Sequence, residues 1–169
     1  MVALIIRLAT EADHVAVLGI VMPVIRAGET YALDRDMTEP AVLAYWFGAD
    51  KQTFVAQAED GAILGTYYLR RNQPGGGRHV CNCGYMTSSM ATGKGVARAM
   101  CLHSLEQARA QGFRAMQFNF VVSSNTRAVG LWKSLGFAEV GRLPGAFDHP
   151  HLGSVDALVL FRSLADGMV

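Results

Sequence analysis

Short runs of alternating apolar and polar residues cover much of the chain, and several of them are bounded by turn-forming residues. Alternation with a period of two is typical of strands that bury one face. The pattern predicts seven strands, at residues 4–8, 54–58, 62–71, 78–86, 115–121, 137–141 and 155–161. The turn Glu59-Asp60-Gly61 then joins the second strand to the third as an antiparallel hairpin.

Four other segments have apolar residues at helical spacing, and we predict helices at residues 10–27, 38–47, 95–112 and 126–135. Thr10 and Thr38 are suitable N-caps for the first two, and glycines stand near the expected C-terminal ends. Strands and helices are interspersed, without repeats or a long linker, so we expect one domain over residues 1–169. Its predicted class is α/β, with a mixed sheet and helices on both faces.

Composition narrows the classes of partner. The formal net charge is +1 and no basic tract is present, so no nucleic acid partner is expected. The apolar runs are too short to span a bilayer and the N-terminus lacks signal-peptide features, so no membrane partner is expected. Three cysteines, with Cys81 and Cys83 alternating on one strand, predict reduced thiols in a cytoplasmic protein rather than a disulfide framework or metal site.

A glycine-rich loop between a strand and a helix is the first candidate site. Gly93 and Gly95 flank Lys94 immediately before the predicted helix. Glycine lets backbone N–H groups approach a ligand closely, and the first helical turn leaves N–H donors unpaired. This combination predicts a phosphate-binding loop. The spacing does not match a P-loop, and Ala97 and Arg98 fit the dinucleotide-binding fingerprint poorly.

Two segments resemble motifs of the GCN5-related N-acetyltransferase (GNAT) family. Residues 92–97, Thr-Gly-Lys-Gly-Val-Ala, are similar to the family pattern Arg/Gln-x-x-Gly-x-Gly/Ala, with Thr92 where Arg or Gln is usual. Residues 125–137 resemble the family segment Asn-x-x-Ala-x-x-Leu-Tyr-x-x-x-Gly-Phe, with Trp132 at the tyrosine position. Two motifs in the family's order, ~30 residues apart, make chance agreement improbable.

The resemblance implies a mostly antiparallel sheet splayed between the fourth and fifth strands, and an enzyme that uses acetyl-CoA as cosubstrate. Pantetheine would pair with the exposed edge of the fourth strand as an added strand does. A tryptophan at position 132 cannot protonate the departing thiolate, so no general acid is assigned. The residues that the resemblance assigns to acetyl-CoA are Tyr85, Met86, Thr87, Thr92, Gly93, Lys94, Gly95, Val96, Ala97, Asn125 and Trp132.

Asn82 and Asn119 are the predicted catalytic residues. Each lies on one of the two splayed strands, where a buried amide without partners costs about 1–3 kcal/mol. The segments His79–Gly84 and Phe118–Val121 resemble those of the proline-analogue N-acetyltransferases known from yeast, which act on azetidine-2-carboxylate. That resemblance implies that one asparagine polarises the thioester carbonyl or positions a water, while the other holds the substrate carboxylate. The alternative is a hydrogen bond that bridges the two strands.

Other polar residues are candidates for substrate contact or for a general base. We expect Glu29, Tyr31, Asn119 and His149 to contact the substrate. Glu29, Tyr31, Asp156, His149 and His151 are the candidates for the base, and a histidine would suit because it titrates near neutral pH. A base acting through water is an equal alternative.

The preferred function is acetylation of a small amine, an amino acid or a toxic proline analogue, in detoxification or metabolism. One alternative is acetylation of an aminoglycoside or a peptide N-terminus, which would favour an acidic pocket or a peptide groove. Another is a non-catalytic CoA-binding module, suggested by the departures at Thr92 and Trp132. The resemblance also implies a homodimer.

Overall fold

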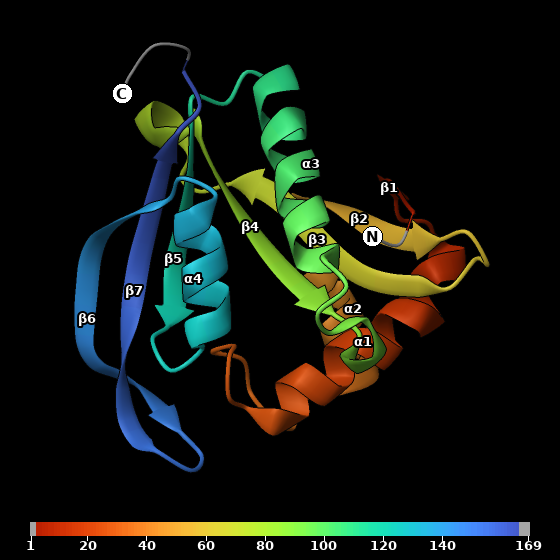
Figure 1. Ribbon diagram of the computed structural model, residues 1–169, viewed down its shortest axis with the longest axis horizontal. Helices are drawn as coiled ribbons and strands as arrows, with labels where there is room; N and C mark the ends of the chain where they lie inside the picture. The colour runs from red at the N-terminus through yellow and green to blue at the C-terminus, as the bar shows by residue number, and fades with distance from the viewer. Residues whose placement is uncertain (1–2, 166–169) are drawn as a thin grey trace.

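Seven strands form one sheet in the order β1-β2-β3-β4-β5-β7-β6 in the computed structural model of the chain, which describes residues 3–165 (Figure 1). The β4–β5 pair is parallel and every other neighbouring pair is antiparallel. This confirms the predicted mixed, mostly antiparallel sheet. The strands are β1 Leu4–Leu8, β2 Lys51–Ala58, β3 Ile63–Arg71, β4 Val80–Thr87, β5 Ala115–Val122, β6 Ala138–His149 and β7 Gly153–Ser163.

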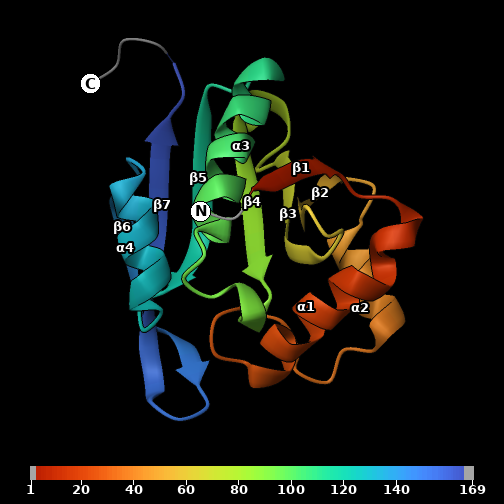
Figure 2. The same ribbon diagram turned by 45° about the vertical axis from the view of Figure 1, so that its right-hand side comes forward.

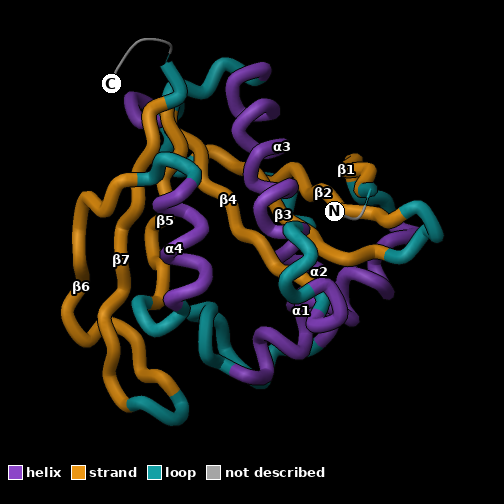
Figure 3. The backbone as a smooth tube through the Cα atoms, in the orientation of Figure 1, coloured by secondary structure: helices purple, strands orange, loops and turns teal. Residues whose placement is uncertain are grey.

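The helices cover both faces of this sheet, as predicted (Figures 2 and 3). They are α1 His14–Ala27, α2 Glu39–Trp46, α3 Val96–Ala110 and α4 Thr126–Ser134. Side chains of α3 and α4 pack with one set of strand residues, and side chains of α1 and α2 pack with another. Tyr67 and Tyr68, adjacent in β3, belong to opposite sets because successive side chains of a strand point to opposite faces.

The last two strands are longer than predicted. Residues 137–141 and 155–161 were expected, whereas β6 runs to His149 and β7 begins at Gly153. The register of this hairpin shifts between Glu139 and Gly141 and again between Leu143 and Phe147. The first shift adds one residue to β6 and reverses the faces of the side chains that follow, and the second adds two residues, so the sequence of β6 shows no steady alternation. His149 therefore ends a strand instead of lying in a loop.

The first helix also begins later than predicted. Residues Glu11–Asp13 form a short 3₁₀ turn, and the α-helix starts at His14. Asp13 accepts two hydrogen bonds of 2.8 Å from the guanidinium of Arg7 and one from the backbone N–H of Thr10. These bonds tie the start of the helix to β1. The hydrogen bond from Arg7 lowers the pKa of Asp13 to about 2.

Asp13→Asn is expected to lower the free energy of unfolding at pH 7 by about 1–2 kcal/mol. Because the pKa of Asp13 is depressed in the folded state, its contribution is present above the unfolded pKa of about 4 and is lost as the pH falls toward 2. Urea unfolding from pH 7 to pH 3 should therefore show the difference shrinking below about pH 4. Asp36→Asn, at an exposed site, is the control. A difference that stays constant with pH would contradict this account.

Candidate active site

The strands β4 and β5 diverge shortly after they begin. Their parallel pairing includes only Val80 with Ala115 and Cys81 with Met116. The side-chain amide of Asn82 then donates a 2.9 Å hydrogen bond to the backbone carbonyl of Gln117. This bond takes the place of the next backbone–backbone hydrogen bond between the two strands. Beyond it the two strands are no longer paired with each other, as the resemblance implied, so the sheet is open at its centre.

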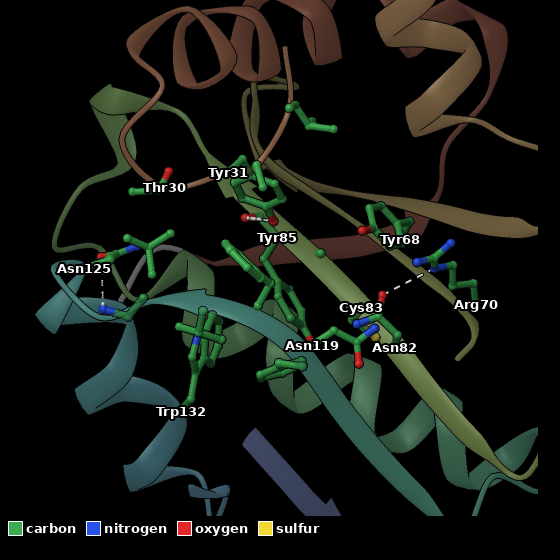
Figure 4. A pocket seen from close by; sticks show the side chains of 18 of the residues that line it. Thr30, Tyr31, Tyr68, Arg70, Asn82, Cys83, Tyr85, Asn119, Asn125 and Trp132 are labelled. Atoms are coloured by element: carbon green, nitrogen blue, oxygen red, sulfur yellow. Dashed lines mark hydrogen bonds between the residues drawn. The ribbon is translucent and has the colours of Figure 1, made fainter. Parts of the chain in front are cut away.

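A cavity of about 240 Å³ occupies this opening (Figure 4). Besides the diverging strands it is lined by the segment after α1, by α2, by β3 and by the start of α4. None of the described residues that line it is Asp, Glu, His or Lys, and its one charged side chain is Arg70. The lining residues are Thr30, Tyr31, Ala32, Leu33, Tyr45, Tyr68, Arg70, Asn82, Cys83, Gly84, Tyr85, Phe118, Asn119, Phe120, Val121, Val122, Asn125, Ala128 and Trp132.

The backbone of β4 presents alternate residues to the opening. The backbone N–H of Ser88 donates to the carbonyl of Leu64, and the carbonyl of Val80 accepts from the backbone N–H of Asn72, each at 2.9 Å. The backbone N–H and C=O groups of the even-numbered residues of β4 therefore point toward β3. In an antiparallel pair the N–H and C=O groups of the residues between them point the other way. The backbone groups of Cys83, Tyr85 and Thr87 therefore face the opening.

Tyr85 and Met86 thus differ in what they offer a ligand. The carbonyl of Tyr85 accepts a 2.9 Å hydrogen bond from the hydroxyl of Tyr31, whereas Met86 faces Thr66 of β3 and packs its side chain against α1 and α2. The resemblance assigned both residues to acetyl-CoA. The backbone N–H of Tyr85 faces the opening, whereas that of Met86 faces β3 within the sheet.

A chain of amide groups lies at the polar end of the cavity. Asn82 accepts a 3.3 Å hydrogen bond from Nε of Arg70 while it donates to Gln117. Asn119 accepts from the side chain of Gln117 at 2.8 Å and donates to Asn72 at 2.7 Å. Both predicted asparagines line the same cavity, with their orientations determined by these partners. The strand-bridging role considered for Asn82 is also present.

The opposite end of the cavity is aromatic. The Trp132 ring lies 5.0 Å from that of Tyr85 and 5.3 Å from that of Phe118, measured between centroids. Asn125 is the N-cap of α4 and accepts a hydrogen bond from the backbone N–H of Ala128. Trp132 therefore packs in the wall between the core and the cavity.

The glycine-rich loop has the geometry of a phosphate cradle. Gly93 and Gly95 both have φ of +78°, and Gly95 is the N-cap of the fifteen-residue helix α3. Residues 92–95 are exposed, and a Cβ atom added at either glycine would meet nothing within 4 Å. The first turn of α3, which begins at Val96 and Ala97, has N–H groups without partners inside the helix. That this loop binds the pyrophosphate of coenzyme A, with Thr92 and Lys94 beside it, stays a prediction.

Of the remaining residues predicted to contact the substrate or to act as base, the structure places only some at the cavity. Tyr31 lines the cavity, but Glu29 and His149 do not. Glu29 instead lies 3.6 Å from the imidazole of His151, and Nδ1 of His149 accepts from the backbone N–H of His151. Asp156 accepts hydrogen bonds from Arg142 and from the backbone of Gly145.

Sequence reasoning did not select Arg70, Tyr45 or Tyr68, all of which line the cavity. Arg70 pairs directly with Asn82 across the β3–β4 ladder. Both strands were predicted, but their register, which singles out Arg70, comes only from the structure.

Two tyrosine hydroxyls and one thiol of the cavity wall are held neutral. Burial raises the pKa of the hydroxyls of Tyr31 and Tyr68 well above the ordinary value, and it raises the pKa of the Cys83 thiol likewise. Desolvation disfavours the charged form of each. The tyrosines can therefore donate hydrogen bonds, and Cys83 is not a thiolate nucleophile near neutral pH.

Among residues 3–165, no cluster of three or more His, Cys, Asp and Glu side chains could hold a metal ion. The part of the chain that the structure describes has no helix long and apolar enough to cross a membrane.

Comparisons with known proteins agree with this geometry. Residues 24–137 match the model of the acetyltransferase (GNAT) family. The N-acetyltransferase aca1 of Schizosaccharomyces pombe is 30% identical over 168 residues, which cover 85% of this chain and 78% of the relative.

Two solved structures are similar over nearly their whole length. A GCN5-related N-acetyltransferase from Kribbella flavida is 42% identical with a TM-score of 0.91, covering 95% of this chain and 98% of its own. A phosphinothricin acetyltransferase from Sinorhizobium meliloti, solved in complex with acetyl-CoA, has a TM-score of 0.85 at 21% identity, covering 98% and 90%. The chain therefore belongs to the GNAT family and is an acetyltransferase that uses acetyl-CoA.

Proposed function

We propose that the enzyme transfers acetyl from acetyl-CoA to the amine of a small amino acid or a proline analogue. The observation that carries the proposal is the cavity of about 240 Å³ with one arginine and no acidic side chain among its described lining residues. Such a site suits an acceptor with a single amine and a carboxylate. Acetylation would convert the basic amine of a toxic analogue into a neutral amide.

The alternatives fit this cavity less well. An aminoglycoside carries several positive charges, which Arg70 would repel and which no lining carboxylate would neutralise. A peptide N-terminus would need an open groove, whereas the segment after α1 is tied to β4 by the Tyr31–Tyr85 hydrogen bond. An inert CoA-binding module would have no use for the polar groups of Asn82 and Asn119, which a purely apolar wall could replace.

Three residues of the site, Tyr85, Asn82 and Asn119, have direct roles in the proposed reaction. Bound acetyl-CoA would supply a thioester: the amine nitrogen bonds to the acetyl carbon as the C–S bond breaks, coenzyme A leaves as a thiolate, and the proton lost by the nitrogen passes to water. The backbone N–H of Tyr85 and the remaining amide N–H of Asn82 stabilise negative charge on the carbonyl oxygen. Asn119 holds the acceptor. Since Cys83 stays protonated, transfer is direct, without an acetyl-cysteine.

Release of coenzyme A, detected by thiol titration, tests the proposal. The panel contains azetidine-2-carboxylate, proline, methionine analogues and an aminoglycoside. Turnover with the amino or imino acids and not with the aminoglycoside is the expected result. Tight binding of acetyl-CoA with no turnover on any amine would instead indicate a binding module.

The pH dependence of kcat/KM should follow the acceptor's own amine. The hydroxyls of Tyr31 and Tyr68 remain protonated well above neutral pH because burial raises their pKa values, so they accept no proton there. For an alkylamine of pKa about 10, kcat/KM should rise about tenfold per pH unit from pH 6.5 to pH 9. A plateau above about pH 7 that disappears in His149→Asn or His151→Asn would contradict this prediction and indicate a histidine base.

A further inference from the structure

The guanidinium of Arg70 donates only two hydrogen bonds to described residues. Its Nε donates to Asn82 at 3.3 Å and its Nη1 donates to Asp50 at 3.4 Å. A guanidinium has five N–H groups in a planar fork, so these two bonds to described residues orient the group and leave N–H groups for a ligand. Figure 4 shows Arg70 and Asn82 at the same end of the cavity, joined by this hydrogen bond.

A second cation lies behind the same wall. The ammonium of Lys51 is 4.6 Å from the ring centroid of Tyr45 and 5.4 Å from that of Tyr68, and both tyrosines line the cavity. The Lys51 side chain is only 6% exposed. Lys51 and Arg70 are partners in the β2–β3 register, so the two cations are placed together by the sheet.

The carboxylate of Asp50 forms ion pairs with both Lys51 and Arg70. Asp50 lies 3.1 Å from Lys51 and 3.4 Å from Arg70, and its side chain is 58% exposed. Two positive charges and one negative charge leave this end of the cavity with a net positive charge, and no acidic residue of the described lining opposes it. A site of this kind attracts an anion.

We infer that Arg70 binds the carboxylate of the acceptor and that Asp50 is the positioning residue for its guanidinium. The inference rests on the proposed function and defines its substrate class. Arginine binds carboxylates through two parallel hydrogen bonds, which are strong where water is excluded. Arg70 is hydrogen-bonded to Asn82, beside which the amine must react, so carboxylate and amine must be close together in the acceptor. The substrate class is therefore an α-amino or α-imino acid.

The test compares two probes that differ only in this charge, azetidine-2-carboxylate and azetidine-2-carboxamide. Their affinities are measured by calorimetry on the full chain saturated with coenzyme A. The unsubstituted enzyme should bind the acid more tightly. Arg70→Met should weaken acid binding about ten- to a hundredfold and leave the carboxamide nearly unchanged, because hydrogen bonds between charged groups are the stronger ones.

Two further variants separate recognition from folding. Arg71→Met changes the next residue, which is exposed and does not line the cavity, and should keep the preference for the acid. Asp50→Asn should reduce the preference by a smaller factor, raising the KM of the acid more than it lowers kcat. A merely structural role of Asp50 would change both probes equally.

Three results would overturn the inference: an unsubstituted enzyme without a preference for the acid, a preference that survives Arg70→Met, or an equal loss for both probes. These outcomes are distinct from failure of the proposed function. Turnover of an amino acid with no Arg70-dependent preference would retain the function and reject the carboxylate site. An Arg70-dependent preference without turnover of any amine would retain the site and reject the function.

Discussion

Asn82→Ala is expected to lower kcat about a hundred- to a thousandfold with a small amino acid acceptor. The amide of Asn82 lines the cavity, and one of its N–H groups is committed to the carbonyl of Gln117. The other is free to meet the oxygen on which negative charge develops. Steady-state kinetics under saturating acetyl-CoA measure the effect.

The same substitution should also destabilise the fold. It leaves the Gln117 carbonyl and Nε of Arg70 without their partner, which costs about 1–3 kcal/mol. Thermal unfolding must therefore show that the variant is folded at the assay temperature. Asn72→Ala is the matched control, because Asn72 belongs to the same amide chain but does not line the cavity. A kcat loss that only tracks the unfolded fraction would leave Asn82 a strand-bridging residue.

Gly95→Val is expected to weaken acetyl-CoA binding about ten- to a hundredfold. Gly95 has φ of +78°, a conformation whose strain in a β-branched residue is about 1–3 kcal/mol. The position where a Cβ would stand is open, so the side chain would project into space that we assign to the phosphates. Relief of the strain would turn the first N–H groups of α3 away from the ligand. Calorimetric titration with coenzyme A measures the loss.

Gly61→Val supplies the control for strain alone. Gly61 has φ of +88° and lies in the exposed turn between β2 and β3. Both variants should lose stability, but only Gly95→Val should lose affinity for coenzyme A. Equal affinities in the two variants would show that the loop is an ordinary glycine-rich turn.

The candidate site was only partly predictable from the sequence. The phosphate loop could be predicted because its signal is local: glycines at the start of a helix determine backbone geometry over a few residues. Asn82 and Asn119 could be selected because polar amides in two buried strands need partners. Arg70 could not, since a half-buried arginine near the end of a strand has no such signature. Its role depends on the register that places it opposite Asn82.

Some features of this protein follow from local sequence patterns, and others depend on contacts between distant segments. The sequence by itself determined seven strands, four helices, the glycine-rich loop before α3 and the family, because these depend on periodicity and on motifs within short segments. Only the tertiary structure decided that Asn119 bonds to Asn72, that Tyr31 reaches the backbone of Tyr85, and that Glu29 and His149 do not line the cavity. Hydrophobic alternation reports which face of a strand is buried. It does not report which residue of another segment will lie opposite, because that depends on packing and register across the whole sheet.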